Sequence, residues 1–239
     1  RRLHGRRVRE SESQRRAARY GLALLSLLAA LALLYLSLPR LQASVHYLPV
    51  DAALKRYFNT GEVPSAQLGA LRQRAGESIT RYPHYRYYDG LSLVNYLVAL
   101  SPETEPWLVR PALNRSLTAA QEAVRRAPAS PRTWLRIART RAALGAPGED
   151  IVGPLNMSIL SGRVEPTLII PRLELAYANL QRLDSESMAL LRDQTLLGWR
   201  ISERSFRQAL REGRLDVSRI ESVIGSHNRS VLQEMEGGT

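Results

Sequence analysis

The chain has 239 residues, of which 44% are hydrophobic, 23% charged and 6% aromatic, so it is neither disordered nor of low complexity. It has no cysteine, which excludes disulfides, thiolate metal sites and cysteine nucleophiles, and its four histidines form no pair at metal-binding spacing. Half of the net charge of +12 lies in residues 1–19, where eight arginines accompany two glutamates. We therefore predict a non-enzymatic protein without a metal or a cofactor.

Residues 1–19 form a basic tail ahead of residues 20–38, which include no charged residue. As a helix, this apolar stretch would span about 28 Å, close to the ~30 Å hydrocarbon core of a bilayer. It is longer than the apolar region of a signal peptide, and Leu41-Gln42-Ala43 is a poor cleavage site. We predict an uncleaved transmembrane helix whose arginine-rich N-terminal side is cytoplasmic.

Four small residues fall on one face of the predicted transmembrane helix. They are Ala23, Ser26, Ala30 and Ser37. Small side chains on one face permit the close approach of a second membrane helix. Because such residues are also common in membrane helices generally, a packing face and ordinary composition both stay open.

Residues 39–64 are predicted to be a connector that contains one short helix. Asp51 is placed to cap the segment DAALKRYF, and Asn59-Thr60-Gly61 is placed to end it. The connector separates the membrane helix from the remainder of the chain.

From residue 65 onward, apolar residues recur at spacings of three and four, and strand-like alternation is nearly absent. The intervening turns are short and rich in Pro and Gly, which favours antiparallel packing of neighbouring helices. We predict an all-α fold with helices over residues 65–82, 86–100, 106–127, 132–144, 149–161, 166–182, 185–200, 203–212 and 217–235.

One segment has a more specific pattern. Six residues after Pro128 comes Trp134, followed by Ile137, Ala138 and a closing Gly145. This pattern resembles the junction between two tetratricopeptide repeats, in which the tryptophan fills the space between helices and the alanine lets them approach. The resemblance implies an α-solenoid of helical hairpins over residues 65–200, capped by helices in residues 201–239.

The sequence departs from the repeat pattern at two positions. Arg141 stands where the family prefers an aromatic residue, and Pro154 interrupts an expected helix. With the anchor, the stretches SLTAAQEAVRRAPASPRTWLRIA and ILSGRVEPTLIIPRLELA also resemble anchored helical-repeat proteins that accompany envelope polysaccharide machinery in Gram-negative bacteria. That resemblance implies a location in the bacterial inner membrane, with the C-terminal domain in the periplasm.

Arginine makes up 33 of the 34 basic residues, and Arg132, Arg136 and Arg139 recur on one predicted helix. By the repeat resemblance, this face lines the concave groove that binds a partner, and arginine suits carboxylate or phosphate groups. Two alternatives to a binding role stay open. The arginines could form an ordinary solvated helix face, and their excess over lysine could reflect the codon usage of a GC-rich genome.

A second candidate surface lies in RYPHYRYYDG, residues 81–90. Its four tyrosines, together with arginine, could form a sugar-stacking or protein-binding surface, or they could pack on the adjoining helices. The tyrosines are Tyr82, Tyr85, Tyr87 and Tyr88.

These patterns favour a membrane-anchored scaffold that binds other membrane or periplasmic proteins through its helical domain. The first alternative is an accessory subunit of a larger membrane complex, for example an energy-transducing one, contacted through the transmembrane helix. A more remote alternative is an enzyme acting on an envelope glycan, although no clustered acid and base is evident. No nucleic-acid partner is expected, since the densest basic run adjoins a membrane helix and is explained by topology and anionic lipid.

Overall fold

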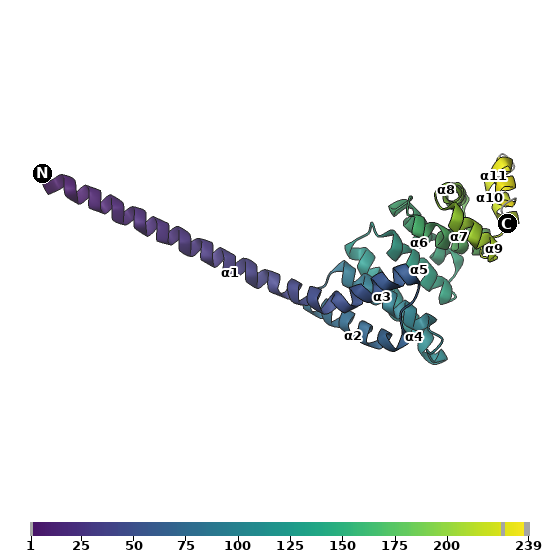
Figure 1. Cartoon of the computed structure of the whole chain (residues 1–239), viewed down its shortest axis with the longest axis horizontal. Coiled ribbons are helices and arrows are strands. Elements are labelled where there is room, and N and C mark those ends of the chain that lie inside the picture. The colour runs from purple at the N-terminus through teal and green to yellow at the C-terminus, as the bar shows by residue number, and fades with distance from the viewer. Residues whose placement is uncertain (1, 226–227, 237–239) are drawn as a thin grey trace.

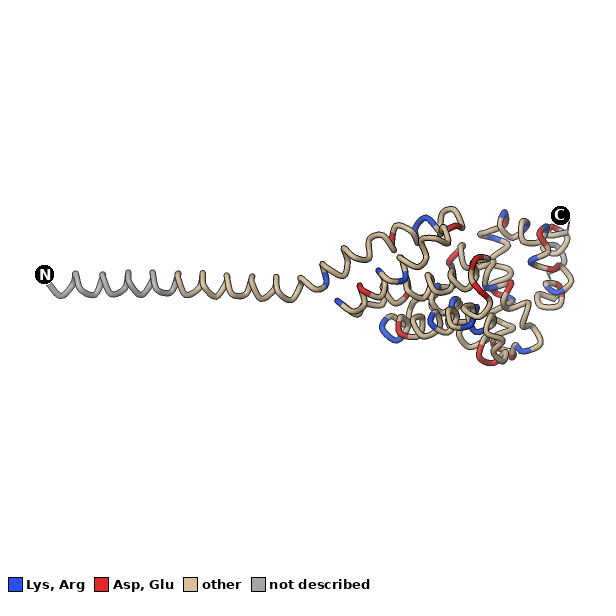
Figure 2. Tube along the Cα trace, turned by 90° about the horizontal axis from the view of Figure 1, so that it is seen from below, with Lys and Arg blue, Asp and Glu red and all other residues tan. Residues whose placement is uncertain are grey.

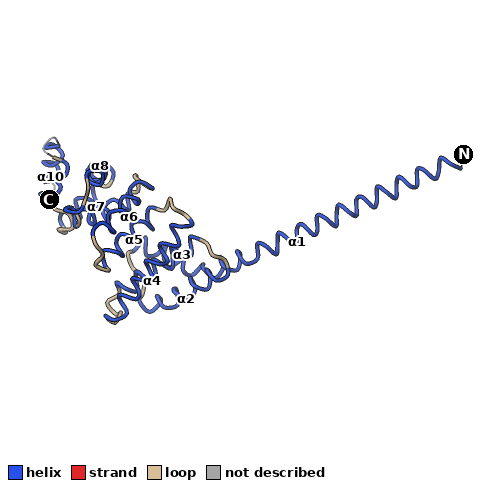
Figure 3. Tube along the Cα trace, turned by 180° about the vertical axis from the view of Figure 1, so that it is seen from behind, coloured by secondary structure: helices blue, strands red, loops and turns tan. Residues whose placement is uncertain are grey.

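The structure is a computed structural model that describes residues 2–225 and 228–236, with side chains described from Arg19 onward except at residues 229, 230 and 236. Helices account for 84% of the protein, and the described residues contain no strand. One long helix projects from a helical body (Figure 1), and the connections inside that body are short (Figure 3). The all-α prediction is confirmed.

Most of the helices have the predicted bounds to within one or two residues. They are α1 (Arg2–Thr60), α2 (Ser65–Arg81), α3 (Tyr85–Leu100), α4 (Pro106–Arg126), α5 (Pro131–Ala143), α6 (Gly148–Ser161), α7 (Pro166–Ala178), the 3-10 turn η1 (Leu180–Arg182), α8 (Ser185–Ile201), α9 (Glu203–Arg211), α10 (Val217–Ile224) and α11 (Arg229–Glu236). The predicted helix 217–235 is divided at Gly225, whose φ of 73° ends α10.

The predicted connector is wrong over residues 39–50, because α1 runs without a break through Pro39 and Pro49. Both prolines are exposed, while one face of the same segment is buried against α2 and α3. The buried residues are Ala43, Tyr47, Val50 and Leu54. Their packing offsets the roughly 3 kcal/mol that a proline costs inside a helix. The helix ends as predicted, at Gly61 with a φ of 79°.

Two tyrosines join α1 to α3. The rings of Tyr47 and Tyr87 lie 4.7 Å apart, and the Tyr47 hydroxyl donates to the carbonyl of Arg86 at 3.1 Å. The Tyr87 hydroxyl lies 2.9 Å from that of Ser44. Burial raises the pKa of Tyr47, which keeps its hydroxyl a donor. Gly90 makes this contact fit, since a Cβ there would lie 1.9 Å from the Tyr47 hydroxyl.

The motif that carries the repeat resemblance packs α5 against both neighbours, with Ile137 against α4 and Ala138 in the cluster that includes α6. Ile137 and Ala138 are buried, and Gly145 has a φ of 74° just after α5. Trp134 is only half-buried, because it covers the edge of the α4–α5 contact and donates its Nε1–H to the carbonyl of Pro128 at 2.7 Å. The hairpins α5–α6 and α7–α8 begin 35 residues apart, at Pro131 and Pro166.

Pro154 does not interrupt α6, contrary to expectation. A proline lacks the N–H that would bond the carbonyl four residues earlier, here that of Asp150. The guanidinium of Arg141 donates to this carbonyl instead, at 2.7 Å. The two departures from the repeat pattern therefore compensate for each other.

A buried arginine joins α6, α7 and α8. Arg172 is 1% exposed and donates to the hydroxyl and carbonyl of Ser158, to the carbonyl of Gly162 and to the side chain of Gln194. Burial lowers the pKa of Arg172 to about 10, which leaves it charged at neutral pH. The carbonyls come from the C-terminal end of α6, where the helix dipole favours a cation.

Substituting Gly90 tests the contact between α1 and α3. Gly90→Ala should lower the free energy of unfolding by about 1–3 kcal/mol, because the new methyl group displaces the Tyr47 hydroxyl. The measurement is chemical unfolding of the full chain in detergent, monitored by circular dichroism. The control is Gly69→Ala, where a Cβ meets nothing within 4 Å, and it should stabilise α2 by up to ~1 kcal/mol. A Gly90 variant as stable as the control would contradict the packing.

A double-mutant cycle tests the link between Arg141 and Pro154. Arg141→Met should lower the free energy of unfolding by about 1 kcal/mol, because the Asp150 carbonyl loses its donor. In a Pro154→Ala background the loss should be smaller, since the introduced alanine supplies a backbone N–H to that carbonyl. Equal losses in both backgrounds would show that the two residues are independent.

Candidate functional site

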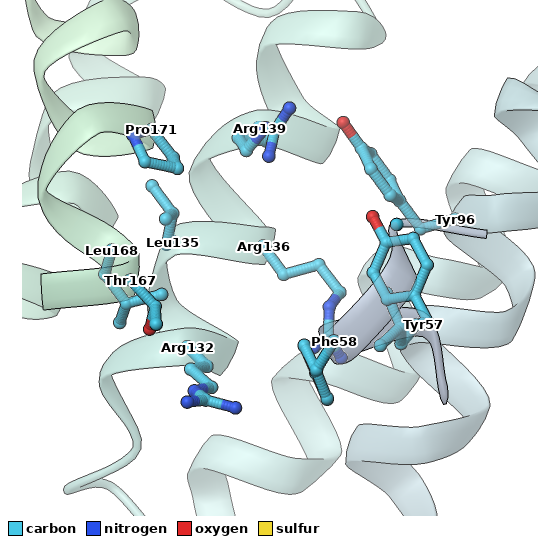
Figure 4. Close-up of a pocket in the computed structure, with 12 residues that line it drawn as sticks. Tyr57, Phe58, Tyr96, Arg132, Leu135, Arg136, Arg139, Thr167, Leu168 and Pro171 are labelled. Carbon is cyan, nitrogen blue, oxygen red and sulfur yellow. The ribbon is translucent and has the colours of Figure 1, made fainter. Parts of the chain in front are cut away.

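In the described part of the chain, a pocket lined by arginines and aromatic rings lies between the C-terminal end of α1 and the helices α3, α5 and α7. We name it the α5 groove (Figure 4), and its volume is about 310 Å³. Its lining combines arginines and aromatic rings and includes no carboxylate. The lining residues are Tyr57, Phe58, Gly61, Leu93, Tyr96, Arg132, Leu135, Arg136, Arg139, Thr167, Leu168 and Pro171.

The structure places all three predicted groove arginines on this lining (Figure 4). The guanidinium of Arg132 lies 4.8 Å from the centre of the Phe58 ring, and that of Arg139 lies 5.8 Å from the Tyr96 ring. A guanidinium held over an aromatic face keeps its N–H groups free to meet an anion. Arg132 also approaches Glu165 at 3.9 Å, a loose and exposed ion pair.

The prediction for Arg136 needs correction. Its side chain is only 7% exposed, and its Nη1 donates to the carbonyl of Asp89 at 2.6 Å and to the carboxylate at 3.0 Å. The Thr133 hydroxyl donates to the same carboxylate at 2.6 Å. Arg136 is thus committed to holding α5 against α3, and Arg132 and Arg139 are left to face a ligand.

The four tyrosines of residues 81–90 do not form one surface. Tyr87 is buried against α1, and Tyr88 lies under the guanidinium of Arg126 at 4.4 Å. Tyr82 and Tyr85 stay near the turn between α2 and α3, where Tyr85 is 42% exposed. Consecutive helical positions point to different faces, so this cluster divides between the core and the surface.

The described length of α1 that projects from the helical body is almost free of charged residues (Figure 2). The small residues Ala23, Ser26, Ala30 and Ser37 are all exposed. The hydroxyls of Ser26 and Ser37 donate to the carbonyls of Leu22 and Leu34 in their own helix. α1 is long and apolar enough to cross a membrane, and none of its apolar window is buried in the described structure.

Sequence reasoning missed the aromatic side of the groove. Tyr57 and Phe58 fall in the predicted connector helix, and Tyr96 falls in an ordinary helix interior. The adjacent pair Tyr57 and Phe58 was a signal for an aromatic surface, because two large side chains at neighbouring positions of a helix end cannot both be buried. Without knowing that α1 is continuous, however, no sequence argument brings them opposite α5.

Removing Asp89 tests the buried pair. Asp89→Ala should lower the free energy of unfolding by about 2 kcal/mol, since it leaves the Arg136 charge buried and unpaired. Adding Arg136→Met should restore part of that loss, because the uncompensated charge is removed. Asp193→Ala is the control, as its ion pair with Arg163 is exposed and should be worth under ~1 kcal/mol. Equal losses at the two sites, measured by denaturant unfolding, would contradict the burial of the pair.

No protein family model, curated protein or solved structure matches the chain. The resemblance to tetratricopeptide repeats stays a prediction from the motif, and so does the link to polysaccharide machinery.

Proposed function

We propose that the protein is a non-enzymatic, membrane-anchored scaffold whose α5 groove binds an acidic segment of a partner protein. In this proposal residues 20–38 cross a bacterial inner membrane, with the N-terminus cytoplasmic and the repeat-like helical domain periplasmic. The observation that carries the proposal is the groove lining, in which Arg132 and Arg139 stand beside aromatic rings. None of the lining residues is a carboxylate, and the nearby Glu165 makes only a loose, exposed pair with Arg132.

The chemistry of the groove fits a carboxylate-bearing chain. Phe58 is 51% exposed, and Tyr57 and Tyr96 extend the aromatic wall beside the two arginines. An aspartate or glutamate can take a bidentate hydrogen bond from a guanidinium while its neighbours pack on the rings. No lining residue is an acid, a histidine or a lysine, so the proposal assigns binding to the groove and no proton transfer.

The continuous helix α1 also sets the distance between the groove and the proposed membrane segment. Tyr57 follows Leu38 by 19 residues in one continuous helix, which corresponds to about 28 Å along the helix axis. A partner segment held there lies clear of lipid headgroups, which favours a periplasmic or juxtamembrane protein segment as the occupant. A role in envelope polysaccharide synthesis rests on resemblance alone and is the narrower part of this proposal.

A second candidate function rests on the exposed length of α1. There the face formed by Ala23, Ser26, Ala30 and Ser37 is available to another membrane helix. In that case the protein is an accessory subunit, for example of an energy-transducing complex, and the groove is secondary.

Charge reversal tests the groove. Arg132→Glu with Arg139→Glu should reduce partner recovery at least tenfold, since two charge-assisted bonds become repulsive. The measurement is mild-detergent extraction from native membranes, size-exclusion chromatography and mass spectrometry of the co-migrating proteins. The matched control is Arg110→Glu with Arg211→Glu, an equal charge change at exposed sites outside the groove.

The same experiment separates the two candidates. Loss of co-migration with Ala23→Leu and Ala30→Leu, but not with the groove variants, would favour the accessory subunit. Migration of the unmodified chain alone, near its own 26.8 kDa plus detergent, would overturn the scaffold proposal.

A further inference from the structure

The continuity of α1 fixes the height of nearby residues above a bilayer. If residues 20–38 cross the hydrocarbon core, Arg40 lies about 3 Å and Ser44 about 9 Å beyond Leu38. The headgroup layer on each side of a bilayer is roughly 5–8 Å thick, so residues 39–43 lie within it. This reasoning rests on the proposed transmembrane function of α1.

Contacts hold the turn between α2 and α3 beside that segment. The guanidinium of Arg40 lies 5.7 Å from the centre of the Tyr82 ring, and the Tyr87 hydroxyl meets that of Ser44. The turn itself is fixed, because the backbone N–H of Arg86 donates to Nδ1 of His84 at 3.4 Å. The turn therefore lies at the height of residues 40–44, in the headgroup layer or at its edge.

The exposed side chains at this turn are of the kinds that favour a lipid interface. Tyr85 is 42% exposed, Tyr82 is partly exposed, and the arginines Arg40 and Arg81 are exposed. Tyrosine is enriched at headgroup level, and a guanidinium binds phosphate oxygens bidentately. The Nη1 of Arg81 donates to the carbonyl of Glu77 at 3.0 Å and lies 3.9 Å from the Glu77 carboxylate, a loose pair, which leaves its Nε–H and Nη2–H groups for a phosphate.

We propose that this turn is a second membrane contact, in which Arg40, Arg81, Tyr82 and Tyr85 bind the phosphate and glycerol region of the lipid headgroups. The protein then contacts the bilayer at two places, through the transmembrane helix and through the turn. Its tilt relative to the bilayer is fixed by both.

Spin labels measure the contact directly, because the chain has no native cysteine and each label site is unique. Single variants Leu28→Cys, Pro83→Cys and Trp107→Cys of the full chain are labelled with nitroxide and placed in phosphatidylcholine–phosphatidylglycerol vesicles. Accessibility to oxygen and to an aqueous nickel chelate gives the depth of each label. Trp107 is the aqueous control: it is 71% exposed and lies beyond the far end of α3, about 24 Å along that 16-residue helix.

We expect the label at 28 in the hydrocarbon core, the label at 107 in water, and the label at 83 at least threefold less accessible to the nickel chelate than that at 107. Equal accessibility at 83 and 107, with 28 in the core, would overturn the second contact and leave the anchor intact. A label at 28 in water would overturn both.

A charge variant tests the arginines separately. Arg40→Gln with Arg81→Gln should raise the nickel accessibility at 83 at least twofold, whereas Arg110→Gln with Arg211→Gln should leave it unchanged. Unchanged accessibility in the first variant would overturn phosphate binding by these arginines.

Discussion

The burial of one face of α1 against α2 and α3 is the constraint on which the other features depend. Ala43, Tyr47, Val50 and Leu54 recur at helical spacing and are all nearly inaccessible. Because this contact keeps the helix unbroken through two prolines, the apolar N-terminal length is joined to the helical body without an intervening loop. The exposed N-terminal part and the packed C-terminal part of α1 therefore belong to one helix, which changes direction where it enters the helical body (Figure 2).

The α5 groove is a consequence of the same contact. Tyr57 and Phe58 belong to the last turn of α1, and they form a wall only because the helix extends past the α2–α3 hairpin to face α5. The Asp89–Arg136 pair sets the other wall by fixing α5 on α3. One arginine of the α5 row is thus structural, and the two on either side of it carry the charge that faces the hollow.

Local patterns in the sequence predicted most of the helices, because their ends carry proline or glycine and their apolar periods are regular. The predicted connector was wrong at residues 39–50, since the energy that keeps α1 helical there, despite Pro39 and Pro49, comes from packing against residues of α2 and α3 that are distant in the sequence. Arg136 was misassigned for a similar reason: Asp89 is 47 residues away and its approach depends on the packing of α3. For the tyrosines of residues 81–90 the sequence left a surface and packing on adjoining helices both open, and Tyr87 packs in the core because α1 covers it. The arginines were placed in a groove through the repeat resemblance, whereas the aromatic half of the groove required the tertiary structure.

A continuous helix fixes the rotation of its residues about the helix axis as well as the distance between them. Each residue turns the chain by about 100°, so the small-residue face near Ala30 and the face that packs on α2 and α3 lie about a third of a turn apart around the axis. A second membrane helix on the first face would approach from a direction that the body does not occupy. Inserting a single residue between Leu38 and Ala43 would swing the groove by more than a quarter of a circle without changing its chemistry. In the proposed membrane orientation, the rotation of α1 about its axis therefore sets the direction in which the groove faces.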